Sequence, residues 1–274
     1  MLLKEYLTNI ANAIRSKLGT ADKVNAQDFA DKVNEVYDKG RNDEWSDFWD
    51  GVQAYGSKTE YSYAFASGWC GEIFYPKYDI KLVGGRNENI FFRFGTNGTG
   101  GKFSEPIDLA ARLEECGVVL DTSKATKLNY MIGDASISRL PVISTLSVSS
   151  LDCALSSCPY IETIDKVILK SDGSQAIGYC FAYNSKLKNI TFDGVIGTSA
   201  NFSWSPLSVE SMKSIISCLK NYLGTSNEAK YKVTFTSDCW EALNASTSPY
   251  EDGLVDDESI DWQDYVMDSL GWLT

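Results

Sequence analysis

The chain has 274 residues, 43% of them hydrophobic, and a formal net charge of −12 at pH 7. Such an acidic chain is a poor match for nucleic acid or anionic membranes, and the absence of histidine removes the most common general base and metal ligand. No apolar run approaches the roughly 20 residues of a membrane span, and the amphipathic start lacks the apolar block of a signal peptide. We therefore expect a globular protein made in the cytoplasm, without nucleic-acid or membrane partners.

The seven cysteines are scattered along the chain and form no Cys-x-x-Cys pair. Cys153 and Cys158 are too far apart for the common zinc spacing. Cys158 and Cys180 fall at positions where a small, buried side chain is expected. The sequence thus predicts free thiols packed as small hydrophobic residues, and neither a metal site nor a cofactor.

Residues 1–55 predict short helices. Apolar stripes at helical spacing run over residues 3–18 and 29–37, each ended by a glycine, and a third short helix is expected over residues 45–52. Helices this short are not stable alone. We expect an assembly or docking segment that forms a homo-oligomer through its stripes; the alternative is a helical hairpin within one chain.

Residues 56–117 form an aromatic-rich region. Aromatic side chains alternate over residues 61–65 and 92–94, which predicts strands, and most of them are expected in the core. Trp69 and Tyr75 are the better candidates for exposure. The glycine-rich stretch 95–103 fails the P-loop pattern and indicates a loop. Residues 107–116 predict a helix ended by Gly117.

Three stretches repeat one another over residues 118–203, at offsets of about 23 to 26 residues, a period typical of solenoids. They begin at Met131, Ala154 and Cys180 and share small or apolar positions in the same order. Residues 204–274 are expected to cap the solenoid, with a helix through residues 212–222, an edge strand over 231–235, a helical turn from Cys239, and an acidic tail that folds back. The predicted fold class is α+β: short N-terminal helices, an aromatic-rich β region, and a short leucine-rich-repeat-like solenoid with an α/β C-terminal cap.

Two resemblances to known families follow from these segments. Residues 120–131 resemble the Asp-Thr-Ser-x-x-Thr-x-x-x-x-Met signature of BspA-like leucine-rich repeats, although Ile132 and Leu155 stand where that class usually has Phe, which only Phe181 keeps. The opening residues 3–29, and residues 48–52, 68–69, 74–80 and 204–216, resemble phage and prophage tail-associated proteins of Gram-positive bacteria. This second resemblance implies a virion component of the tail tip, baseplate or fibre, with other tail or baseplate proteins as partners.

The predicted function is a phage tail structural protein that contributes to binding a host cell-wall glycan and has no catalytic role. The alternatives are a tail-associated glycan depolymerase, which would need two carboxylates placed across a substrate, and a cell-surface leucine-rich-repeat adhesin. The expected binding surface is the open sheet face, and its candidate residues flank the buried Leu or Ile of each repeat: Arg139, Glu162, Lys188 and Asn189, with neighbouring Ser138 and Thr163. Trp69, Tyr160 and Tyr183 could supply an aromatic plane for a sugar. The alternative is that these are ordinary solvated residues.

Overall fold

The computed structural model describes residues 74–76, 79–85, 90–91 and 106–274, together with Asn12, Arg15 and Asn87. The chain divides into two units, residues 1–57 and 58–274, and the description that follows concerns the second. The expected helices of residues 1–55, the expected strands at 61–65 and 92–94, the loop at 95–103 and Trp69 lie outside the described residues.

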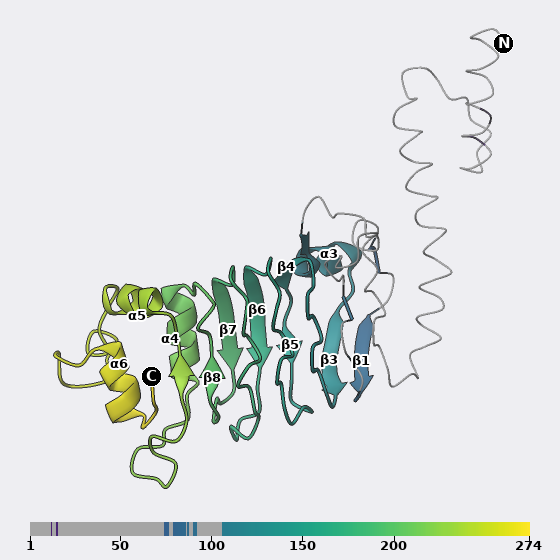
Figure 1. The fold of residues 1–274 in the computed structure, drawn as a ribbon. Coiled ribbons are helices and arrows are strands. Elements are labelled where there is room, and N and C mark those ends of the chain that lie inside the picture. The colour runs from purple at the N-terminus through teal and green to yellow at the C-terminus, as the bar shows by residue number, and fades with distance from the viewer. Residues whose placement is uncertain are drawn as a thin grey trace, which may run out of the picture. The chain divides into compact units, whose positions relative to one another are not determined.

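The described part of the second unit is a mixed α/β fold with parallel strands (Figure 1). Its strands are β1 (Ile80–Gly84), β2 (Ile107–Asp108), β3 (Leu120–Ala125), β4 (Ile137–Leu140), β5 (Ile143–Ser144), β6 (Thr163–Ile168), β7 (Asn189–Asp193), β8 (Ala200–Asn201) and β9 (Val233–Thr234). Its helices are α3 (Leu109–Cys116), α4 (Val209–Ser217), α5 (Ser237–Asn244) and α6 (Trp262–Asp264), and α6 continues into a π-helical turn over Tyr265–Ser269.

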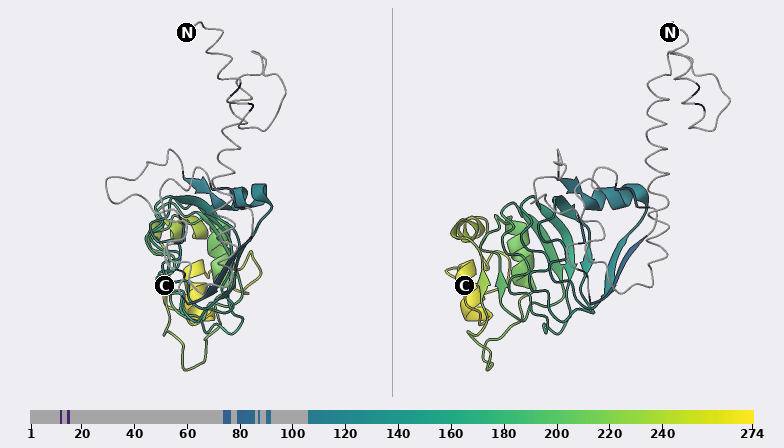
Figure 2. Two further views of the ribbon diagram at one scale, coloured as in Figure 1. Left: turned by 90° about the vertical axis from the view of Figure 1, so that its right-hand side faces the viewer. Right: turned by 45° about the vertical axis from the view of Figure 1, so that its right-hand side comes forward.

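The strand pairs of the described residues are all parallel, and the pairs among β4, β5, β6 and β7 join residues 24 to 26 positions apart, which is one sequence repeat. Arg139 pairs with Thr163, and Thr163 pairs with Asn189, which lies 26 residues further along the chain. A second line of pairs joins Ile143 to Val167 and Val167 to Phe192. The strands belong to a five-stranded sheet, which consists of β2, β4, β5, β6 and β7, and to two two-stranded sheets, β1 with β3 and β8 with β9. Together they follow a curled path (Figure 2). The expected mixture of helices and strands is therefore confirmed, and the repeat offset is the spacing between hydrogen-bonded neighbours.

Helix α3 has the end signals that its sequence predicts. The Asp108 carboxylate accepts a hydrogen bond from the Ala111 amide at 2.8 Å, and Gly117 closes the helix with a φ of 65°. Leu109 and Leu113 are buried. The expected helix was two residues too long, because Ile107 and Asp108 pair with β4 as strand β2.

The core of the unit consists of the apolar positions of the repeats. Cys158 and Cys180 are fully buried, as predicted, with Ile132, Leu155 and Phe181. Burial raises the pKa of the Cys158 thiol to about 12 and also raises the pKa of Cys180. Toward the C-terminus the core becomes aromatic, through ring contacts that link five side chains with centroid distances from 4.8 to 6.3 Å: Phe181, Phe192, Phe202, Phe235 and Trp240.

Buried polar side chains join neighbouring repeats. The Asn184 side chain accepts from the Cys158 amide at 2.9 Å and donates to the Leu155 carbonyl at 2.6 Å. One repeat earlier, the Cys158 thiol donates to the carbonyl of Ile132 at 2.7 Å. The two side chains therefore satisfy backbone groups at equivalent places in successive repeats.

The structure of residues 204–274, the expected cap, differs from the prediction in two places. Helix α4 ends at Ser217 and not near Gly224, because the backbone around Leu219 pairs with Ile196 and leaves the helical path. The expected edge strand is reduced to β9, and it lies between β8 and the chain end, where the Val233 amide donates to Leu273. The tail folds back as predicted, with four buried apolar residues: Trp262, Val266, Leu270 and Trp272.

Among the described residues, no helix combines the length and the apolar character that crossing a membrane requires.

Candidate ligand-binding surface

Four turn segments stack on one another and form what we call the turn face: residues 128–135, 151–158, 177–184 and 200–205. Backbone hydrogen bonds join each segment to the next. The Tyr130 amide donates to Cys153 at 3.1 Å, the Ser157 amide donates to Ala182 at 2.9 Å, and the Asn201 amide donates to Gly178 at 3.1 Å. The backbone of the turn face is thus built like a parallel sheet, with its segments in a fixed order along the stack.

The backbone conformation also repeats along the turn face. Asp134, Ser157 and Tyr183 have φ angles of 58°, 60° and 62°, and Tyr130 and Cys153 have φ angles of 54° and 56°. Non-glycine residues seldom adopt this left-handed conformation, and it recurs here at corresponding places in successive segments. The tight turns that result carry exposed side chains at the outer edge of the stack.

Large aromatic side chains are exposed on the turn face. Tyr130 is 50% exposed, Tyr179 and Tyr183 are each 58% exposed, and Trp204 is 55% exposed. The rings of Tyr183 and Trp204 lie with their centroids 5.3 Å apart and their planes at 34°. Adjacent segments therefore present a continuous pair of aromatic rings to the solvent.

A cavity of about 480 Å³ adjoins this pair. It lies between the last turn segment and the start of α5, where the Thr236 hydroxyl accepts a hydrogen bond from the Cys239 amide at 3.2 Å. Its polar lining consists of Ser185, Ser203, Thr236, Ser237 and Asp238, and its apolar lining of Trp204, Pro206, Leu207, Cys239 and Ala242. Hydroxyl groups and one carboxylate thus surround an aromatic ring.

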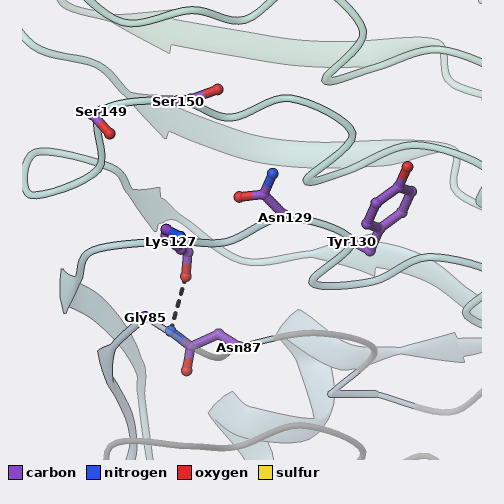
Figure 3. Close-up of a pocket in the computed structure, with 7 residues that line it drawn as sticks. All are labelled: Gly85, Asn87, Lys127, Asn129, Tyr130, Ser149 and Ser150. Atoms are coloured by element: carbon purple, nitrogen blue, oxygen red, sulfur yellow. Dashed lines mark hydrogen bonds between the residues drawn. The ribbon is translucent and has the colours of Figure 1, made fainter.

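A second cavity, of about 450 Å³, lies at the other end of the turn face (Figure 3). It is lined by Gly85, Asn87, Lys127, Asn129, Tyr130, Ser149 and Ser150. Asn87 is fully buried, and its side-chain nitrogen donates to the carbonyls of Lys127 at 2.9 Å and Gly84 at 3.2 Å. Through these two hydrogen bonds the amide anchors one corner of the cavity.

The structure separates the site residues that the sequence predicts into two groups. Arg139, Glu162, Lys188 and Asn189 are exposed at neighbouring positions of β4, β6 and β7 and the residues just before them. Tyr183 lies on the turn face instead.

Arg139 already has a partner. Its guanidinium donates two hydrogen bonds to Asp165, at 2.7 and 3.1 Å, and lies 3.9 Å from the Asp108 carboxylate. Tyr160 is half-buried, with the Lys186 ammonium 5.1 Å from its ring centre. On the sheet face the arginine is therefore engaged within the protein, beside a cavity of about 630 Å³ that Arg139 and Asp165 help to line. The turn face differs in combining a cavity with exposed aromatic rings.

Sequence reasoning missed Trp204 as a site residue. It assigned this residue to the cap, although a signal was present: Trp204 follows Phe202 by two positions, as Tyr183 follows Phe181. Phe181 and Phe202 stack at 5.1 Å with an angle of 14° between their planes, so the two segments are equivalent in space. The segment with Phe202 and Trp204 thus packs on the segment with Phe181 and Tyr183 at both aromatic positions.

Comparison with known proteins found no relative of this chain. No family model matches the chain, and no curated protein and no solved structure matches it.

Proposed function

We propose that this chain is a structural protein of a phage or prophage tail, and that it binds a host cell-wall glycan through the turn face without catalysing a reaction. The observation that carries the binding proposal is the exposed pair of Tyr183 and Trp204 beside a cavity rich in hydroxyl groups. The tail assignment rests on the sequence segments that resemble tail-associated proteins.

A sugar ring suits this surface for a physical reason. Its C–H face is apolar and loses unfavourable hydration when it stacks on an aromatic ring, while its rim of hydroxyls needs hydrogen-bond partners. Ser185, Ser203 and Asp238 provide such partners next to Trp204. Sites for small ligands generally combine a large apolar surface with a few placed polar groups.

We further propose that the stack is a short leucine-rich-repeat-like solenoid. This is supported by the parallel pairing of segments one repeat apart and by the equivalent buried roles of Cys158 and Asn184. Residues 204–274 would then be its C-terminal cap and residues 56–117 would pack on its other end.

In the virion, residues 1–55 would join this protein to other copies and to neighbouring tail or baseplate proteins. This part of the proposal rests on the apolar stripes in the sequence alone.

Co-sedimentation with purified cell walls of the bacterium that carries the gene tests the binding proposal. We expect saturable pelleting of the full chain, retained after protease treatment of the walls and lost after periodate oxidation of their sugars. Tyr183→Asn combined with Trp204→Ala should abolish pelleting. Asparagine is chosen at position 183 because it tolerates the positive φ of that residue.

Tyr250→Ala is the matched control, since Tyr250 is 47% exposed but lies outside the turn face. It should pellet like the unmodified chain. Pelleting that is unchanged in the double variant would contradict the assigned site. Absence of pelleting by the unmodified chain would contradict glycan binding as a whole.

A further inference from the structure

We propose that the ligand of the turn face is a linear, neutral polysaccharide that lies along the stack, from the cavity beside Tyr130 to the pair of Tyr183 and Trp204. This inference rests on the proposed glycan binding and adds the length, direction and charge of the ligand. It follows from where the exposed groups lie on successive turn segments.

The direction follows from the backbone hydrogen bonds between segments. Because the Tyr130 amide donates to Cys153, and Asn201 donates to Gly178, the four segments occupy successive places in one stack. Neighbouring strands in a parallel arrangement lie about 4.8 Å apart, so the three steps from the first segment to the last span roughly 14 Å. A single sugar ring cannot cover that span, whereas a short run of linked rings can.

The aromatic residues are spread along this line. Tyr130 is on the first segment, Tyr179 and Tyr183 are on the third, and Trp204 is on the fourth, and each is at least half exposed. A compact ligand would need its aromatic contacts at one place. Rings at both ends and in between instead suit a polymer that offers one apolar face after another.

The cavity beside Tyr130 provides the polar groups for one end of such a chain. Figure 3 shows Lys127, Asn129 and Tyr130 on one segment and Ser149 and Ser150 on the next, around an open space. Amide, hydroxyl and ammonium groups all form hydrogen bonds with sugar hydroxyls. The first turn segment thus has a polar cavity beside Tyr130, just as the last turn segment has the hydroxyl-lined cavity beside Trp204.

The charge of the protein favours a neutral wall polymer over an anionic one. A net charge of −12 repels a polyanion at long range, and the two cavities offer one lysine and one aspartate, Lys127 and Asp238. The surface has no cluster of basic groups in these linings that could hold a row of phosphates. We therefore assign a neutral polysaccharide and not a phosphate-linked polymer.

The test uses wall polysaccharide released from the same bacterium by mild acid, separated into neutral and anionic fractions, and each fractionated by size. Binding to the full chain is measured by isothermal titration calorimetry. We expect the neutral tetrasaccharide and longer fractions to bind at least about tenfold more tightly than the mono- and disaccharides, equivalent to about 1.4 kcal/mol. Tyr130→Asn should reduce the affinity of the long fractions to near that of the short ones.

Asparagine again preserves the left-handed backbone, since Tyr130 has a φ of 54°, and an unchanged thermal midpoint would show that the variant folds. Tyr250→Ala should leave all affinities unchanged. Tyr183→Asn should weaken both the short and the long fractions.

Two kinds of failure are distinguishable. Equal binding of short and long fractions, or long-fraction binding that Tyr130→Asn does not change, would overturn the extended mode but leave glycan binding intact. Tighter binding of the anionic fractions would overturn the charge assignment. No binding of any fraction, with pelleting that protease treatment of the walls removes, would overturn both proposals and indicate a protein receptor.

Discussion

Replacing Gln175 by leucine should destabilise the stack, because this side chain bridges two neighbouring repeats from a buried position. Gln175 is 2% exposed. Its side-chain nitrogen donates to the carbonyls of Thr145 at 2.7 Å and Val148 at 2.9 Å, and its oxygen accepts from the Lys170 amide at 2.6 Å. Leucine has a similar size but offers neither a donor nor an acceptor.

The expected magnitude follows from the backbone groups that would lose a partner. The Thr145 carbonyl keeps a second bond, from the Val148 amide at 2.9 Å. The Val148 carbonyl and the Lys170 amide both depend on Gln175. An unsatisfied buried polar group costs about 1–3 kcal/mol, and the added apolar surface of leucine recovers part of that, so we expect a net loss of about 3 kcal/mol.

Urea unfolding followed by tryptophan fluorescence measures this loss. The second unit carries Trp204, Trp240, Trp262 and Trp272, so its unfolding should be visible in the signal. Gln263→Leu is the matched control, because the same chemical change is made at a half-exposed glutamine of α6. It should change the free energy of unfolding by less than about 0.5 kcal/mol.

A loss below about 1 kcal/mol in Gln175→Leu would refute the reasoning, because it would mean that water or a backbone shift satisfies both groups at little cost. Gln175→Glu provides a second check. It retains an oxygen for the Lys170 amide but cannot donate to the Val148 carbonyl while ionised, so it should also destabilise.

Three further predictions concern backbone geometry and buried thiols. Gly194→Ala should destabilise by about 2–4 kcal/mol, since the new Cβ would lie 2.3 Å from the Leu169 carbonyl oxygen at a φ of 101°. Ser157→Gly should stabilise by about 0.5–1 kcal/mol by removing a left-handed serine with a φ of 60°. Cys158 should resist thiol reagents at pH 8 until the chain unfolds, and its burial should cost stability as the pH rises from about 9 to about 12, because only the unfolded thiol ionises in that window.

Each of these has a control and a contradicting result. Gly178→Ala should be tolerated, since its nearest neighbour would be 4.0 Å from the new Cβ, and equal losses in the two glycine variants would contradict the clash. Ser185→Gly should not stabilise, because Ser185 is not among the positive-φ residues. Labelling of Cys158 in the folded protein at pH 8, located by peptide mass spectrometry, would contradict its burial.

Local sequence patterns predicted the elements that depend on neighbours along the chain. Helix α3 was correct at its C-terminal end because Gly117 can adopt the left-handed conformation that closes a helix. Helix α4 was predicted, but its expected end was wrong. The helix ends where Leu219 pairs with Ile196. The spacing of apolar residues along the chain cannot predict this contact, because its two residues are far apart in the sequence.

The candidate site was predicted only in part for a similar reason. The places of Lys188 and Asn189 beside the buried Leu or Ile of their repeat predicted that they are exposed, and they are exposed. The partnership of Arg139 with Asp165 and the contact of Tyr183 with Trp204 join residues in different repeats. Such contacts depend on the register between repeats, which a single-residue insertion changes.

The repeat offset, the buried positions within each repeat and the roles of Cys158 and Asn184 could be predicted from the residues alone, because they recur at a fixed spacing and a stack must bury the same positions each time. The tertiary structure alone decided that Gln175 spans two repeats and that Trp204 lies beside Tyr183. Both depend on which atoms of one repeat meet those of the next, and that is settled only when the parallel strands pair.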